Sequence, residues 1–155
     1  MSRRSVRIED RVLAAVREEA RRAYPHEGCG ALLGPAPGHV SETLPVPNTE
    51  GEAPRVRFAV SPRDYLAVED HAEERGLRLL GFWHSHPDHP ARPSETDRRY
   101  AWEGLLTVVV GVDQGVPRTI TAWDLVDERF VEVPIDIPIA ASGLPAGLDV
   151  SQEVS

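Results

Sequence analysis

The chain has 155 residues, 41% of them hydrophobic and 27% charged, a globular composition that excludes a disordered or fibrous class. At this length we expect one domain that folds alone and buries roughly two-thirds of the surface of the unfolded chain. The 17 basic and 25 acidic residues give a net charge of −8, which argues against nucleic acids and anionic membranes as partners.

Two further features of the sequence bear on where the protein works. No stretch of about 18 consecutive apolar residues predicts a membrane-spanning helix, and charges interrupt the first apolar positions, so no signal peptide is predicted. The one cysteine, Cys29, excludes a disulfide within the chain. We therefore expect a cytoplasmic protein with no membrane partner.

The first part of the chain predicts a helix followed by three strands. Residues 8–23 form an amphipathic helix that ends before Pro25, because apolar positions recur at helical spacing among charges. These positions are Ile8, Val12, Leu13, Val16, Ala20 and Ala23. Short apolar or alternating runs predict strands over residues 29–33, 41–46 and 55–60, with proline-rich loops between them.

Helix signals open the next segment. Ser61 is a typical N-cap and Pro62 suits the first helical position, so we expect a second helix that ends near Gly76 and covers one face of a sheet. A strand over residues 77–83 follows it, and Ser94 begins a third helix.

The last third of the chain supplies the centre of the sheet. Residues 105–112 form an almost unbroken apolar run, which is typical of a strand buried on both faces. Two further strands are predicted over residues 118–125 and 130–135, and a flexible tail over residues 139–155. The elements together predict a fold of both helices and strands, α/β in the broad sense and α+β in the narrower one. Its mixed sheet is flanked by about three helices, in a single domain over residues 1–138.

The most informative segment runs from His84 to Asp97, between the strand over residues 77–83 and the third helix. Side chains two residues apart on an extended chain point the same way, so His84 and His86 offer both imidazoles to one ion. Asp97, in the first turn of the helix, adds a carboxylate oxygen.

Two histidines, one carboxylate and a water molecule make a tetrahedral zinc site with an open position, the arrangement that catalytic zinc uses. Structural zinc sites are closed, often by cysteines, and this chain has only Cys29. Peptide hydrolysis also needs a group that accepts a proton from the attacking water and passes it to the leaving amine. We choose Glu27, because the glycines beside it let the backbone approach another segment closely.

The same residues resemble the signature of the JAMM (MPN-plus) zinc metallopeptidases. That signature has two histidines separated by one residue. An aspartate follows after ten intervening residues, with a serine three positions before it, and a glutamate lies upstream. The matching residues here are Glu27, His84, Ser85, His86, Pro87, Ser94 and Asp97. The segment from Glu27 to Gly30 is also similar to the one that carries the catalytic glutamate in small bacterial members.

The resemblance implies a fold and a mechanism. The fold would be a JAB1/MPN-like domain with a mostly antiparallel curved sheet and a cytidine-deaminase-like architecture. One Zn²⁺ per chain would be held by His84, His86 and Asp97, with Glu27 as general base. Ser94 would donate a hydrogen bond to the oxyanion of the tetrahedral intermediate.

The resemblance also implies a substrate. Members of the family are peptidases and isopeptidases that act at the C-terminus of ubiquitin-like proteins, and small bacterial ones resemble enzymes that trim sulfur-carrier proteins. We therefore expect zinc-dependent hydrolysis of an amide bond at the C-terminal tail of such a protein, which is the expected partner. A second copy of the chain, forming a homodimer, stays open as a further partner.

Two other functions fit part of the sequence. One is a metal-free binding or scaffold module of the MPN type. The other is a metallo-β-lactamase-like hydrolase, because residues 84–89 also fit the motif H-x-H-x-D-H. The second ranks lower, because such proteins need further histidines downstream and none follows His89.

Overall fold

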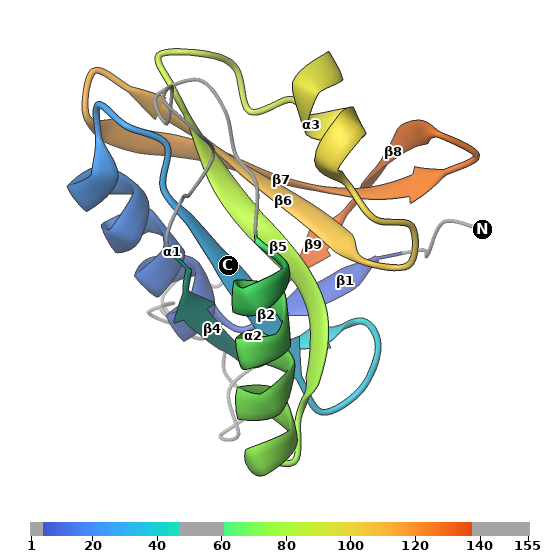
Figure 1. Cartoon of the computed structure of the whole chain (residues 1–155). Helices are drawn as coiled ribbons and strands as arrows, with labels where there is room; N and C mark the ends of the chain where they lie inside the picture. The colour runs from blue at the N-terminus through green and yellow to red at the C-terminus, as the bar shows by residue number, and fades with distance from the viewer. Residues whose placement is uncertain (1–4, 47–60, 138–155) are drawn as a thin grey trace, which may run out of the picture.

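The computed structural model describes residues 5–46 and 61–137, which form two sheets and three helices (Figure 1). The helices are α1 (Asp10–Ala23), α2 (Pro62–Glu74) and α3 (Glu95–Tyr100). The larger sheet contains β2 (Cys29–Gly34), β4 (Glu42–Pro45), β5 (Arg78–Pro87), β6 (Leu106–Asp113), β7 (Val116–Val126) and β8 (Arg129–Val133). The smaller sheet contains β1 (Val6–Ile8), β3 (His39–Val40) and β9 (Ile135–Asp136).

The six-stranded sheet has the order β4-β2-β5-β6-β7-β8. All its neighbouring strands run antiparallel except β5 and β6, which run parallel at its centre. This confirms a mixed, mostly antiparallel sheet with three helices around it. It also confirms that the apolar run near residue 105 forms a central strand.

Helices cover the two faces of this sheet. The apolar side of α1 packs with Trp83 of β5 in the larger hydrophobic core, which also contains residues of β1, β6 and β7. Helix α2 lies on the opposite face, where Val68 and Ala72 pack against Ala31 and Leu33 of β2. The central strand β5 is therefore held from both sides.

The predicted boundaries are wrong at three places. Ile8 belongs to β1 rather than to the first helix, because Val6 and Ile8 alternate with an exposed residue and pair with β3 and β9. The strand predicted over residues 77–83 continues to Pro87, since β5 stays paired with β6 to that point. The strand predicted over residues 130–135 is two strands, because Pro134 separates β8 from β9 and they join different sheets.

Other local predictions are confirmed where the structure describes them. The Ser61 hydroxyl accepts a hydrogen bond from the Asp64 N–H at 3.1 Å and caps α2, and Gly76 follows that helix with a positive φ of 72°. The strand predicted over residues 55–60 and the tail over residues 139–155 lie outside the described residues. None of the described helices is long and apolar enough to cross a membrane.

The packing of β5 against β6 gives a testable prediction. A Cβ atom at Gly81 would lie 2.1 Å from the Leu106 carbonyl oxygen, so Gly81→Ala must push the two central strands apart. We expect the free energy of unfolding to fall by about 1–3 kcal/mol, measured by thermal or urea denaturation. Glu73→Ala, at an exposed position of α2, should change it by no more than about 0.5 kcal/mol. Equal stability of Gly81→Ala and the wild type would contradict this close contact.

Candidate active site

The central strand β5 presents His84 and His86 on one face, because side chains two residues apart share a face of a pleated strand. Both histidines are buried, at 1% and 7% exposure. The residue between them, Ser85, points to the other face. Pairing with β6 fixes the backbone of both histidines, and pairing with β2 on the other side reaches as far as His84. The loop predicted to carry them is therefore the last part of a strand.

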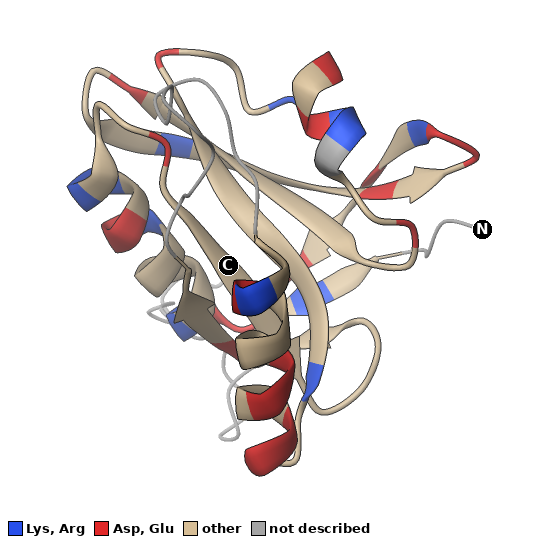
Figure 2. Ribbon diagram, in the orientation of Figure 1, with Lys and Arg blue, Asp and Glu red and all other residues tan. Residues whose placement is uncertain are grey.

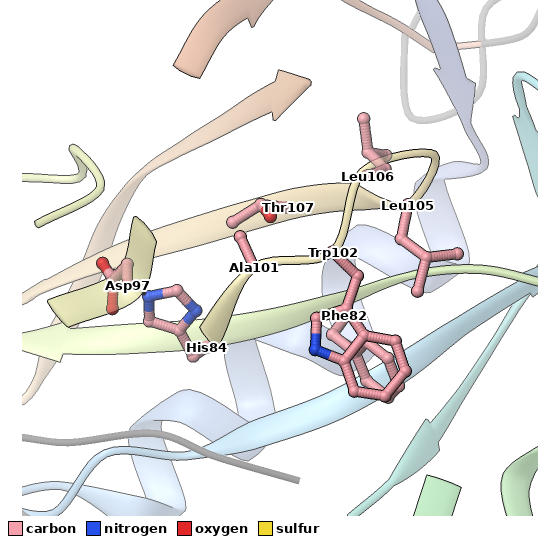
Figure 3. Close-up of a pocket in the computed structure, with 8 residues that line it drawn as sticks. All are labelled: Phe82, His84, Asp97, Ala101, Trp102, Leu105, Leu106 and Thr107. Carbon is pink, nitrogen blue, oxygen red and sulfur yellow. Dashed lines mark ion pairs between the residues drawn. The ribbon is translucent and has the colours of Figure 1, made fainter. Parts of the chain in front are cut away.

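The Asp97 carboxylate lies between the two imidazoles. Its Oδ2 is 3.0 Å from Nε2 of His84 and 3.0 Å from Nε2 of His86. These three residues form a group whose ligand atoms all lie within 4.8 Å of one another. Ligand atoms around a tetrahedral zinc ion are roughly 3.3 Å apart, given bonds of about 2.0 Å. The separations thus fit a metal ion at this point, and Figure 3 shows His84 and Asp97 pointing toward each other.

The first turn of α3 holds Asp97 in place. Ser94 and Asp97 form a capping box, in which the Asp97 N–H donates to the Ser94 hydroxyl at 3.0 Å. The Ser94 N–H donates in return to the Asp97 carboxylate at 2.8 Å. This start of the helix therefore turns a carboxylate toward β5.

The imidazole of His86 is oriented by a backbone oxygen. Its Nδ1 lies 2.9 Å from the Pro90 carbonyl oxygen, which accepts the Nδ1 proton of a neutral ring and leaves the Nε2 lone pair for a metal ion. Burial lowers the pKa of His86, but hydrogen bonds to Asp97 and to the Pro90 carbonyl raise it overall. Burial alone would raise the pKa of Asp97, yet the hydrogen bonds from the two histidines hold it well below its usual range. The carboxylate is therefore ionised, as a metal ligand must be.

Glu27 lies beside this group and is also buried, at 7% exposure. Loss of solvation raises its pKa to about 8, because burial and the charge of Asp97 outweigh the opposing effect of His86. At neutral pH in the metal-free protein it holds a proton. A carboxyl group whose pKa lies near neutrality is suited to taking up and giving back a proton.

Ser85, to which the sequence pattern assigns no role of its own, joins the Glu27 segment to β5. Its hydroxyl accepts a hydrogen bond from the Gly28 N–H at 2.8 Å, and its own N–H donates to the Gly28 carbonyl at 3.0 Å. One residue on the far side of the ligand strand thus sets the distance between Glu27 and the histidines. The spacing rule that selects residues 84 and 86 leaves Ser85 out, because it faces the opposite way.

Glu27, His86 and Ser94 share an open cleft of about 380 Å³. The other residues that line it are His89, Pro90, Arg92, Pro93 and Thr96. A separate small cavity of about 30 Å³ lies beside His84 and Asp97, bordered by Phe82 and Trp102 (Figure 3). The five residues proposed for the site therefore meet in space, and the larger opening leads to Glu27.

Cys29 is excluded as a nucleophile or metal ligand. It is buried, its thiol donates a hydrogen bond to the Val46 carbonyl at 3.0 Å, and burial raises its pKa to about 12. This environment disfavours the thiolate that a nucleophile needs, and Cys29 does not belong to the metal-binding group found among the described residues.

Asp88 makes structural hydrogen bonds, which disfavours the metallo-β-lactamase alternative. Its carboxylate accepts hydrogen bonds from the Tyr24 hydroxyl and the Gln114 N–H, each at 2.8 Å. Neither Asp88 nor His89 belongs to a metal-binding group within the described part of the chain. The motif H-x-H-x-D-H is thus present in the sequence but not in the geometry.

Comparison with known proteins finds similar chains and a similar solved structure. A relative from Haloferax volcanii named desampylase is 32% identical over 83% of this chain and 90% of its own length. The CysO-cysteine peptidase of Mycobacterium bovis is 28% identical over 76% of this chain and 81% of its own length. The solution structure of a protein from Desulfitobacterium hafniense has a TM-score of 0.75 and 26% identity, covering 86% of this chain and 92% of that one.

The family described as prokaryotic homologs of the JAB domain matches residues 9–126, which span the first helix, both histidines, Asp97 and the strands from β2 to β7. This match extends over more than half of the chain. The protein therefore belongs to the family of prokaryotic homologs of the JAB domain.

Proposed function

We propose that the chain is a zinc-dependent peptidase that hydrolyses an amide bond at the C-terminus of a ubiquitin-like or sulfur-carrier protein. The observation that carries this proposal is that His84, His86 and Asp97 meet at one point, while Glu27 lines the adjoining cleft. The names of the relatives, a desampylase and a peptidase, support the same chemistry and the same class of substrate.

Zinc is the metal that this set of donors fits best. Two imidazole nitrogens and one carboxylate oxygen are its usual ligands at catalytic sites, where a fourth position stays open. A bound zinc ion would lower the pKa of a water molecule and polarise the substrate carbonyl. His84, His86 and Asp97 would hold it.

Side chains around the metal-binding group would carry out the proton transfers and bind the oxyanion. Glu27 takes a proton from the attacking water and passes it to the leaving amine, since its carboxyl lies in the cleft and is shielded from solvent. The Ser94 oxygen already accepts the Asp97 N–H, so its own proton is available to the oxyanion that develops in the cleft. We also infer a cytoplasmic location, where a lone cysteine stays reduced.

A metal-free scaffold is the second candidate, because a JAB-type fold does not by itself establish catalysis. All three ligand positions and the proposed base are filled in this chain, which favours the enzyme. Metal analysis after zinc reconstitution separates the two. Stoichiometric zinc supports the peptidase, and protein that binds none supports the scaffold.

Substitutions at Glu27 and His86 separate proton transfer from metal binding. Glu27→Gln should keep its zinc and lose turnover by about 10²–10⁴-fold, because the base is gone while the ligands stay. His86→Ala should lose both zinc and turnover. Zinc content by mass spectrometry and cleavage of a carrier with a C-terminal extension are the measurements. Wild-type turnover in Glu27→Gln would remove this residue from the mechanism.

Two matched caps test the role of Ser94. At full zinc occupancy, Ser94→Ala should lower kcat by about 10²–10³-fold, because the oxyanion loses a hydrogen-bond donor while the backbone N–H of residue 94 still donates to the Asp97 carboxylate. Ser61→Ala removes from α2 a cap in which the hydroxyl likewise accepts the N–H three residues on, at a cost of about 1 kcal/mol in stability, and should leave kcat unchanged. Equal effects of the two substitutions on kcat would mean that Ser94 only caps α3.

The raised pKa of Glu27 predicts a pH dependence of stability in the metal-free protein. The folded state keeps the proton until about pH 8, whereas the unfolded chain releases it near the ordinary value of 4.5. Between these values folding takes up a proton, so the contribution of Glu27 to stability falls as the pH rises. The Tm of Glu27→Gln relative to wild type should therefore increase from about pH 5 to about pH 9. A difference in Tm that is independent of pH would contradict the raised pKa.

A further inference from the structure

We propose that Arg92 binds the free α-carboxylate of the residue that is released, so that the enzyme prefers to remove a single C-terminal amino acid from its carrier. This inference rests on the proposed function and adds the class of leaving group to it. The comparisons leave this class open, because the relatives have different names, one a desampylase and another a CysO-cysteine peptidase.

The position of Arg92 in the cleft is the first argument. Among the described residues that line the 380 Å³ cleft, Arg92 is the only arginine or lysine, and Glu27 and Ser94 line the same cleft. In an α-amino acid, one carbon atom separates the amine from the carboxylate. A leaving amine that receives its proton from Glu27 therefore brings its carboxylate into the same cleft.

The loop that carries Arg92 is held in place, so the guanidinium starts from a fixed backbone. The Pro90 carbonyl lies 2.9 Å from Nδ1 of His86 and also accepts the Arg92 N–H at 2.8 Å. The Thr121 hydroxyl donates to the Ala91 carbonyl at 2.7 Å. A charged side chain on a fixed backbone loses less conformational entropy on binding a ligand than one on a loosely held loop.

The charge of Arg92 is available to a ligand. Within residues 5–46 and 61–137, Arg92 makes no ion pair, whereas Arg98 on the next helix pairs with Glu95. Acidic residues recur along α2 (Figure 2), which lies on the same face of the sheet as α3. None of these acidic residues lines the cleft that contains Arg92. An arginine fork binds a carboxylate through two parallel hydrogen bonds.

The leaving group of an isopeptide is chemically different. The ε-amine of a lysine side chain has no carboxylate beside it, because the lysine's own carboxyl group is tied up in a polypeptide backbone. An arginine that lines the same cleft as the base therefore discriminates between the two kinds of substrate.

Binding of two matched peptides tests the proposal. The zinc-loaded full chain with Glu27→Gln binds a labelled peptide ending in Gly-Gly-Ala, either as the free acid or as the C-terminal carboxamide, and fluorescence anisotropy gives both Kd values. We expect the acid to bind about tenfold more tightly, as a charge-assisted hydrogen bond would give. Adding Arg92→Gln should bring the ratio close to one, and Arg92→Lys should restore part of it.

Arg99→Gln is the control, because Arg99 is exposed on α3 and does not line the cleft. It should keep the preference for the acid. Equal binding of the two peptides, binding of neither, or a preference that survives Arg92→Gln would overturn the proposal.

Turnover by the zinc-loaded wild type separates this inference from the proposed function. Cleavage of both peptides with equal kcat/KM would overturn the role of Arg92 and leave the peptidase intact. An Arg92-dependent binding preference without cleavage of either peptide would support the carboxylate site and count against the peptidase.

Discussion

The proposed active site depends on two imidazoles from β5 that converge on one carboxylate from α3. Each imidazole Nε2 lies 3.0 Å from the same oxygen of Asp97. Neither contact is made by flexible surface groups, because all three side chains are buried. The parallel pairing of β5 with β6 fixes the two histidines, and the capping box at the start of α3 fixes the aspartate.

This arrangement places several ionisable groups out of water, which is costly unless they are paired or bind a cation. Asp97 is stabilised as an anion by its two histidines and the Ser94 N–H, whereas Glu27 keeps its proton in the metal-free protein. The two carboxyl groups thus have opposite protonation states within one site. Such a difference between neighbouring acids is a common basis for assigning one as a ligand and the other as a proton carrier.

The sequence predicted the parts of the site that depend on local geometry. The spacing of His84 and His86 follows from the pleat of a strand, and a cap at Ser94 places Asp97 in the first helical turn. Contacts between distant segments could not be predicted in this way. The bond between Ser85 and Gly28, and the bonds that Tyr24 and Gln114 donate to Asp88, join residues with no common sequence pattern.

The errors in the fold have the same cause. The short strands β3 and β9 each pair with β1 across more than 30 residues of sequence, and none of the three has a periodic pattern long enough to be identified alone. Ile8 was assigned to the helix for this reason, since its spacing from Val12 is also helical. The long apolar strand β6, in contrast, is identifiable from composition, because it is buried on both faces.

X-ray absorption at the zinc edge, recorded on the zinc-loaded full chain, would identify the atoms bound to the ion. We expect only nitrogen and oxygen neighbours at about 2.0–2.1 Å, with the multiple scattering of two imidazole rings. Replacing His86 should remove one imidazole from this shell, while replacing His89 should leave it as it is. A sulfur neighbour, or a spectrum that does not change when His86 is replaced, would show that His84, His86 and Asp97 are not the zinc ligands.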